Sequence, residues 1–233
     1  FFQIRNAKSY DDSHHIFYGV KSGGPMFVET TDDGESWQVA LQDESNTSYN
    51  PSGFSTPEPN VFFVSDKSGN IFKTTDSGNN WESTAVNDSG NINSLYMYSR
   101  LYGVAASTGK ELGLFKTNDG WRNFEKLEFP ETESKIIDIK DFKILNDGRF
   151  AFIANLEDSP DKFCQSADRG NSWSVSDIPS GCINTFFLDS LNGWAVGYRY
   201  SGIGENRDGI IAKTEDGGNT WELNLKESQN PAG

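Results

Sequence analysis

The eight residues Thr74-Thr75-Asp76-Ser77-Gly78-Asn79-Asn80-Trp81 decide the fold, because their pattern returns along the whole chain. The pattern is a hydroxyl residue, any residue, Asp, any residue, Gly, any residue, a small polar residue and an aromatic residue. Four regular copies of this turn motif end at Trp37, Trp81, Trp173 and Trp221, and a degenerate copy with its Gly one place early ends at Phe124. These aromatic residues follow one another at steps of 44, 43, 49 and 48 residues, so five repeat units of about 46 residues fill the 233-residue chain.

Each repeat unit contains the same succession of short apolar segments. Two apolar residues and then a variable one precede each motif, and after it the chain alternates with period two, as at Trp37, Val39 and Leu41. This pattern predicts a hairpin of two strands. An apolar run such as Phe150 to Ala154 precedes the hairpin, and a further strand such as Ile136 to Phe142 precedes that run. Four strands in a repeat of this length are typical of a propeller blade.

The sequence therefore predicts an all-β protein, a β-propeller of four-stranded antiparallel blades in a single domain, residues 1–233. Its five repeat units either close a five-blade ring or form part of a larger propeller. The predicted units span residues 1–42, 50–87, 91–130, 134–178 and 181–226.

The composition excludes several other classes of protein. Gly supplies 23 residues and Pro 8, which is too many for a bundle of long helices. The 17 Phe, 8 Tyr and 6 Trp can bury a substantial core, which argues against disorder. No apolar run reaches the roughly 18 residues of a spanning helix, so we expect no membrane insertion. The net charge of −14 argues against a nucleic-acid partner.

The turn motif has a structural logic of its own. Gly supplies the positive φ of a tight turn, and the Asp and hydroxyl side chains can hydrogen-bond to turn amides. The aromatic residue packs back on its own blade. Five copies argue against catalysis, because one active site needs one constellation of acids. The residues given this structural role are Asp32, Gly34, Trp37, Asp76, Gly78, Trp81, Asp119, Phe124, Asp168, Gly170, Trp173, Asp216, Gly218 and Trp221.

These segments resemble the Asp-box repeat of sialidases, sortilin-type receptors, xyloglucanases and the photosystem II assembly and stability factor family. The last repeat unit is most similar to the assembly-factor family, because Asp189 to Gly197 followed by Gly209 to Trp221 looks like its blade signature. The resemblance covers the whole chain at the level of repeats. It implies a propeller fold and an extracellular or periplasmic location. Members of that family usually have more blades and a basic, Arg-bearing surface, whereas this acidic chain has seven Arg.

Two enzymatic alternatives come with the same resemblance. Sialidases grip a substrate carboxylate with a cluster of Arg, and here only Arg199 and Arg207 fall on the expected binding face. Xyloglucanases use two opposed carboxylates between two propellers, and this chain supplies one. We therefore expect a non-enzymatic binding or assembly scaffold whose propeller face engages a protein, peptide or glycan partner. The alternative is a carbohydrate-active module, either a glycoside hydrolase or sialidase-like fragment or a glycan-binding module.

The expected binding face carries the second-to-third loops and the connections between blades, if the first strand of each blade is innermost. Two of these segments are long, Tyr198 to Asp208 and Gln42 to Pro57. They are either solvated loops or part of a ligand-contacting surface, together with the acidic loop that includes Asp161. The candidate binding residues are Tyr49, Phe54, Glu157, Asp158, Tyr198, Arg199, Tyr200 and Arg207.

We expect no metal site and no cofactor. The two histidines, His14 and His15, are adjacent on or near a strand, so their side chains would point to opposite faces. Cys164 stands where other repeat units have an apolar residue, and Cys182 lies just before the first strand of the next unit. The two thiols are either small buried side chains or a disulfide that bridges two blades.

Overall fold

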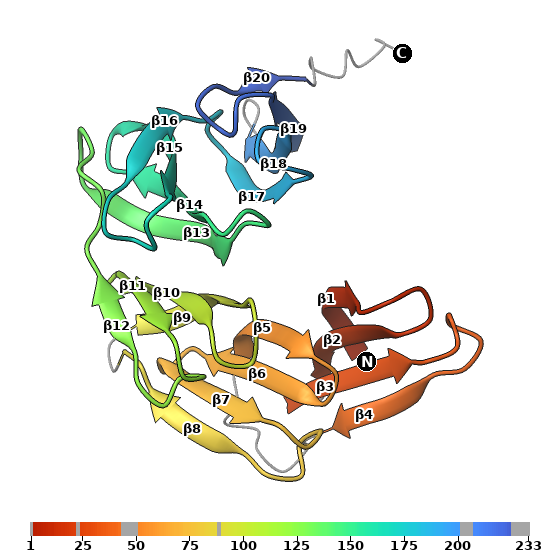
Figure 1. Cartoon of the computed structure of the whole chain (residues 1–233). Coiled ribbons are helices and arrows are strands. Elements are labelled where there is room, and N and C mark those ends of the chain that lie inside the picture. Colours follow the sequence, from red (N-terminus) through yellow and green to blue (C-terminus); the bar gives the residue numbers. More distant parts are fainter. Residues whose placement is uncertain (1, 22–23, 43–50, 88–89, 201–206, 225–233) are drawn as a thin grey trace. The chain divides into compact units, whose positions relative to one another are not determined.

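The computed structural model describes residues 2–21, 24–42, 51–87, 90–200 and 207–224 (Figure 1). These residues form 20 strands and contain no helix. A helix able to cross a membrane is accordingly not found within these ranges. The strands make five four-stranded sheets in which neighbouring strands run antiparallel. The fold class is therefore that of a five-blade β-propeller with four-stranded antiparallel blades, which confirms the sequence prediction.

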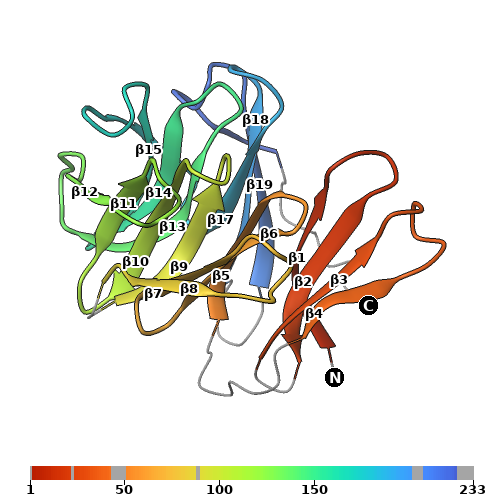
Figure 2. The same ribbon diagram turned by 60° about the horizontal axis from the view of Figure 1, so that its bottom comes forward.

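The chain divides into two compact parts, an N-terminal part (Phe1–Lys126) and a C-terminal part (Leu127–Gly233). The N-terminal part holds three blades, which Figure 2 shows from a second side. Blade 1 consists of β1 (Phe2–Ser9), β2 (His15–Lys21), β3 (Gly24–Thr30) and β4 (Gln38–Gln42). Blade 2 consists of β5 (Pro51–Glu58), β6 (Val61–Asp66), β7 (Asn70–Thr74) and β8 (Glu82–Ala85). Blade 3 consists of β9 (Gly90–Met97), β10 (Gly103–Gly109), β11 (Gly113–Thr117) and β12 (Glu125–Leu127).

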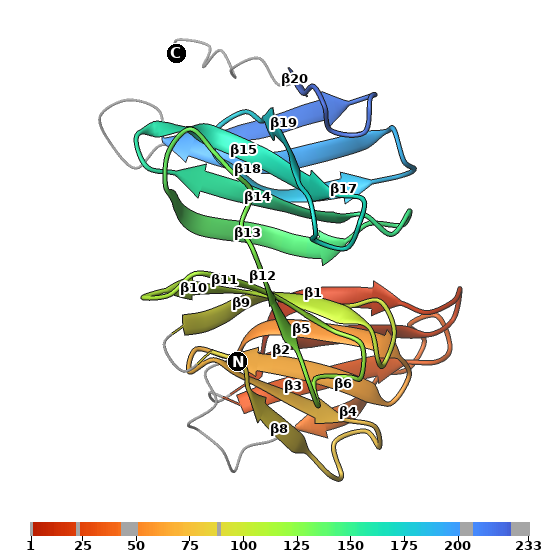
Figure 3. The same cartoon turned by 60° about the vertical axis from the view of Figure 1, so that its left-hand side comes forward.

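The C-terminal part holds two blades, whose strands can be followed in Figure 3. Blade 4 consists of β13 (Ile136–Ile144), β14 (Phe150–Leu156), β15 (Ser159–Ser166) and β16 (Ser174–Asp177). Blade 5 consists of β17 (Cys182–Phe187), β18 (Gly193–Tyr200), β19 (Arg207–Thr214) and β20 (Glu222–Leu223). In every blade the strands pair in chain order, so each turn motif connects the third strand to the fourth. The prediction of a single domain over residues 1–233 stays a prediction.

The second strands of blades 2, 3 and 4 (β6, β10 and β14) are buried on both faces, and they contribute to the core of each part. In β6, Val64 packs with side chains of blade 1, while its neighbour Phe63 packs with side chains of blade 3. In the C-terminal part, Ile153 and Phe163 of blade 4 pack with Phe187 of blade 5. Burying one Phe side chain fully contributes roughly 1.5–3 kcal/mol. The aromatic side chains thus hold adjacent blades together within each part.

One strand differs from the sequence prediction. The segment Gln42 to Pro57 has the Pro, Gly and Ser content of a loop, and the sequence predicts a connection there. The structure instead places Pro51–Glu58 in β5, the first strand of blade 2. The ladder between β5 and β6 shifts register once near Pro51 and again around Pro57. These irregularities accommodate residues that cannot donate a ladder hydrogen bond, so the strand forms despite its composition.

The two cysteines are free, which corrects the disulfide alternative. Cys182 lies in the core cluster that also contains Phe163 of β15. Cys164 follows Phe163 directly in the same strand, so its side chain points to the opposite face of the sheet. Burial raises the pKa of the Cys164 thiol to about 12 and that of the Cys182 thiol to about 11. Both residues therefore act as small buried side chains.

Candidate binding site

The five turn motifs share one hydrogen-bond pattern. In blade 2 the Thr74 hydroxyl donates to the Asp76 carboxylate (2.7 Å) and accepts from the Gly78 amide (2.9 Å). The same carboxylate accepts from the backbone amide (2.9 Å) and the side-chain amide (2.7 Å) of Asn80. Equivalent bonds occur at Asp32, Asp119, Asp168 and Asp216. The Asp and hydroxyl residues therefore satisfy polar groups of the turn, as the sequence predicts.

The turn of blade 3 differs from the other four at one position. In the regular copies Gly adopts a φ between 87° and 91°, a conformation that costs Gly little. In blade 3 Trp121 occupies this position with a φ of 67°, and its amide donates to the Thr117 hydroxyl (3.0 Å). Its ring is buried in the core between blades 2 and 3, where Nε1 donates to the Met97 sulfur (3.0 Å). The sequence pattern did not reveal this substitution, because the adjacent Gly120 reads as the displaced motif glycine.

The aromatic residues of the motif contact more than their own blade. Trp173 packs on Phe152 of its own blade, with ring centroids 5.1 Å apart. Trp221 lies between Phe187 of its own blade (5.9 Å) and Phe163 of blade 4 (5.3 Å). The prediction that the aromatic residue packs on its own blade is therefore incomplete. The motif also contributes to the contact between adjacent blades.

Hydrogen bonds lower the pKa of the motif carboxyls. Chiefly because of the hydroxyl side chain four residues later, the pKa of Asp32, Asp168 and Asp216 is lowered to about 2. The pKa of Asp76 is lowered first by the Asn80 side chain, and that of Asp119 first by a backbone amide. A general acid at neutral pH needs a raised pKa, and the lowered pKa of these carboxyls makes them unsuitable for that role.

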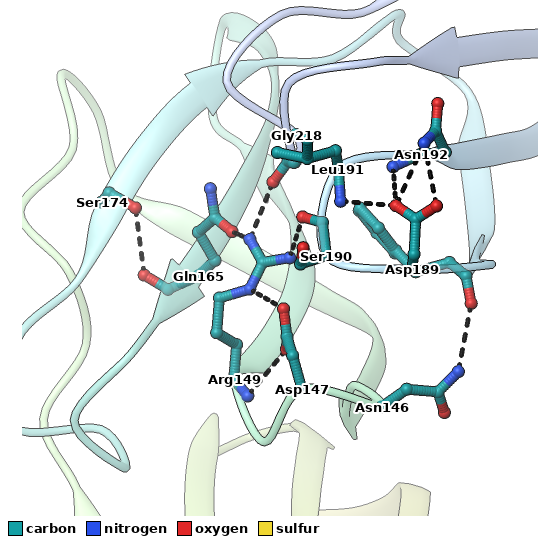
Figure 4. Close-up of polar contacts among 12 residues, drawn as sticks. Asn146, Asp147, Arg149, Gln165, Ser174, Asp189, Ser190, Leu191, Asn192 and Gly218 are labelled. Atoms are coloured by element: carbon teal, nitrogen blue, oxygen red, sulfur yellow. Dashed lines mark hydrogen bonds and ion pairs between the residues drawn. The ribbon is translucent and has the colours of Figure 1, made fainter.

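Arg149, which lies just before β14, holds the turn motif of blade 5 (Figure 4). Its Nη1 donates to the Gly217 carbonyl (2.9 Å), and its Nη2 donates to the Ser190 carbonyl (2.8 Å). Its Nε pairs with the Asp147 carboxylate (2.8 Å), and Gln165 accepts a further bond from Nη1. Such a planar fork of donors fixes geometry as well as charge. Arg149 is therefore a structural clamp within the C-terminal part.

The predicted binding residues of the N-terminal part are Tyr49 and Phe54. Tyr49 lies outside the described residues. Phe54 lies in β5 and stacks on Tyr18 with ring centroids 4.1 Å apart, packed against the core cluster between blades 1 and 2. Because Phe54 belongs to a strand, its placement on a loop is corrected, while its role as a ligand contact stays a prediction.

The predicted acidic loop lies between β14 and β15. Glu157 and Asp158 are exposed there, and Asp158 has a positive φ of 55°. Asp161, which belongs to the same predicted loop, is instead buried and accepts hydrogen bonds from the Gly181 amide (2.9 Å) and the Asn155 side chain (2.5 Å). Asp161 is therefore structural, while Glu157 and Asp158 stay predicted ligand contacts.

The predicted long loop of blade 5 is shorter than the sequence suggests. β18 continues to Tyr200 and β19 begins at Arg207, so these two residues pair at the end of the ladder. Tyr198 and Arg199 are exposed near the same end of β18. Alternating apolar and polar residues account for the longer strands. All four residues stay predicted ligand contacts.

A groove of about 530 Å³ lies beside β16 in the C-terminal part, and sequence reasoning missed it. Lys162 of β15 donates to the carboxylates of Asp177 (2.6 Å) and Glu133 (2.7 Å). The bond to Asp177, and then that to Glu133, raises the pKa of Lys162, while Lys162 lowers the pKa of Glu133. Three carboxylates and one ammonium leave the groove with a net charge of −2. Its lining residues are Glu131, Thr132, Glu133, Lys162, Val175, Ser176, Asp177 and Asn219.

The histidines contact different carboxylates. His14 Nε2 is 3.2 Å from Glu29, and His15 Nε2 is 3.2 Å from Asp33. In the part of the chain that the structure describes, no group of three or more His, Cys, Asp or Glu residues is arranged to hold a metal ion.

Known proteins resemble this chain in structure. The sequence matches no known protein-family model and no curated protein. YCF48 bound to D1 peptide has a TM-score of 0.57 and 16% identity, covering 96% of this chain and 81% of that one. YCF48 from Cyanidioschyzon merolae has a TM-score of 0.56 and 14% identity, covering 96% of this chain and 85% of that one. The GH74 enzyme of Niastella koreensis has a TM-score of 0.61 and 12% identity, covering 94% of this chain and 38% of that one. At such identities the likeness establishes the propeller fold.

Proposed function

We propose that the chain is a non-enzymatic propeller that binds a segment of a protein partner. The observation that carries this proposal is the likeness to YCF48 bound to D1 peptide, which extends over 96% of this chain. Packed sheets are a rigid scaffold, and loops and grooves on such a scaffold hold contact residues in place for an incoming peptide.

Two surfaces of the C-terminal part suit such contacts. One is the exposed end of β18, with Tyr198 and Arg199. The other is the groove beside β16. We also propose an extracellular or periplasmic location, which the resemblance to Asp-box proteins supports and which fractionation of the source cells would test.

A library of random peptides displayed on phage tests the proposed function. We expect the folded chain to select peptides with a shared sequence, and calorimetry to show one peptide bound per chain. Arg199→Ala should weaken that binding at an unchanged melting temperature if the end of β18 is the contact. Selection of no peptide would contradict the proposal.

The alternative is a carbohydrate-active module, which the TM-score of 0.61 to the GH74 enzyme favours. Hydrolysis needs two carboxyl groups on opposite sides of the scissile bond, roughly 5–9.5 Å apart. Incubation with xyloglucan, followed by a reducing-end assay and a binding assay, separates the two functions. Release of reducing ends would replace the proposed binding function with hydrolysis, and retention on xyloglucan without release would indicate a glycan-binding module.

A further inference from the structure

The groove beside β16 offers more negative charge than its own lysine compensates. We propose that this groove binds a Lys or Arg side chain from a basic segment of the protein partner. The inference rests on the proposed function and adds the chemical class of the segment and the place where it binds.

The carboxylates of the groove keep capacity for a second cation. Lys162 contacts one oxygen of Asp177 (Oδ1) and one of Glu133 (Oε1), which leaves the other oxygen of each as an acceptor. These side chains are accessible, since 85% of Asp177 and 49% of Glu133 is exposed. Glu131 has no hydrogen bond or ion pair among the described residues. A cationic group entering the groove therefore meets acceptors that no other described residue uses.

The shape of the groove suits a long basic side chain. Its volume of about 530 Å³ falls in the range of roughly 300–1,000 Å³ that is common for binding pockets. Val175, which is 37% exposed, supplies an apolar wall for the methylene stem of Lys or Arg. The charged end of the ligand would then reach the carboxylates, while the peptide backbone stays outside.

The arrangement favours arginine over other charged groups. A guanidinium presents a planar fork of donors that pairs with a carboxylate through two parallel bonds, and it is more weakly hydrated than an ammonium. A phosphate or carboxylate ligand would instead be repelled by the net charge of −2. A basic peptide therefore fits this groove better than an acidic one.

Fluorescence polarisation with short labelled peptides tests the inference. The probe is a Gly/Ser peptide with two Arg residues and blocked ends, and the matched probe carries Glu in place of Arg. We expect the Arg probe to bind and the Glu probe not to bind. Glu131→Gln and Asp177→Asn should each weaken the Arg probe by about 2–5-fold, as for exposed ion pairs. Glu82→Gln removes the same charge from exposed β8 and should leave the affinity unchanged.

A second variant keeps the test independent of folding defects. Lys162→Gln removes the ammonium that competes for the carboxylates, so it should tighten the Arg probe severalfold, an effect that a destabilised chain would not produce. Equal binding of the two probes, or equal weakening by Glu82→Gln and Glu131→Gln, would overturn the inference. Phage selection of peptides whose affinity the groove variants leave unchanged would also overturn it, while the proposed function would stand. If phage selection yields no peptide, the proposed function fails first.

Discussion

The turn of blade 3 and the turns of the other four blades reach the same hydrogen-bond pattern by different routes. The regular turns place Gly at the left-handed position, whereas blade 3 places Trp121 there with a φ of 67°. That conformation costs an L-residue roughly 1–2 kcal/mol, and the burial of the Trp121 ring offsets the cost. The turn therefore requires a residue in the left-handed conformation whose amide donates to the hydroxyl group. Burial of its side chain can offset the conformational cost that Gly avoids.

The largest effect in this comparison is expected at Trp121. Trp121→Ala removes a buried aromatic ring and keeps the unfavourable φ, so the free energy of unfolding should fall by about 3–5 kcal/mol. Trp121→Gly also removes the ring but relieves the backbone, which should recover about 1–2 kcal/mol of that loss. Urea unfolding of the two variants measures the difference.

The order of these two variants is the informative result. At an ordinary position Gly is less stable than Ala by roughly 0.5–1 kcal/mol, because it loses more conformational freedom on folding. A more stable Trp121→Gly variant would show the strain directly. A more stable Trp121→Ala variant would mean that the left-handed backbone at position 121 carries no cost.

The regular turns should tolerate a side chain at Gly to different extents. A Cβ at Gly34 (φ 87°) would meet no atom closer than 3.7 Å, so Gly34→Ala should cost only the backbone term of about 1–2 kcal/mol. A Cβ at Gly218 (φ 91°) would lie 2.4 Å from the Phe163 ring, so Gly218→Ala adds overpacking of about 1–3 kcal/mol. Thermal unfolding of both variants compares the two costs, and equal destabilisation would show that Phe163 moves aside freely.

The clamp on the turn of blade 5 gives a smaller effect. This turn is held from outside by Arg149, whereas the turn of blade 3 is held by its own Trp. Arg149→Lys keeps the charge but places three donors on one nitrogen, so it cannot replace the four bonds that Arg149 makes from three nitrogens to Gly217, Ser190, Asp147 and Gln165. We expect a loss of about 1–2 kcal/mol in the free energy of unfolding. Arg122→Lys, at an exposed position of the blade 3 motif, is the matched control and should have no effect. An unchanged stability of Arg149→Lys would show that the carbonyl bonds contribute nothing.

The sequence predicted the blades well because their determinants are local. Period-two alternation and a repeated turn motif indicate strands and turns directly, and the five copies of the motif support the same prediction independently. The left-handed conformation of Trp121 was not predicted, because backbone strain is visible only in the structure. In the sequence, the neighbouring Gly120 takes the place of the motif glycine, shifted by one residue. The groove was not predicted because Lys162 and Asp177 meet only when β15 pairs with β16, and Glu131 comes from the segment before β13, which is distant in sequence.

Acid sensitivity is the smallest effect and tests whether the two kinds of turn are equivalent. The pKa of Asp32, Asp168 and Asp216 is lowered from 3.8 to about 2 in the folded chain. Because the folded value lies below the unfolded one, the contribution of these groups is complete above about pH 4. It is lost as the pH falls from about 4 through about 2. The melting temperature should therefore drop in this window, although solvent screens these exposed groups and keeps the change modest.

Single Asn variants then compare the two kinds of turn directly. Asp168→Asn cannot titrate, so its melting temperature should fall less steeply between pH 4 and 2 than that of the unmodified chain. Asp119→Asn should flatten the profile in the same direction, because the pKa of Asp119 is also lowered, chiefly by a backbone amide. If Asp119→Asn left the slope unchanged while Asp168→Asn reduced it, the hydrogen bonds of the blade 3 turn would not be equivalent to those of the regular turns. Trp121 would then compensate in blade 3 for the hydrogen bonds to the carboxylate as well as for the missing glycine.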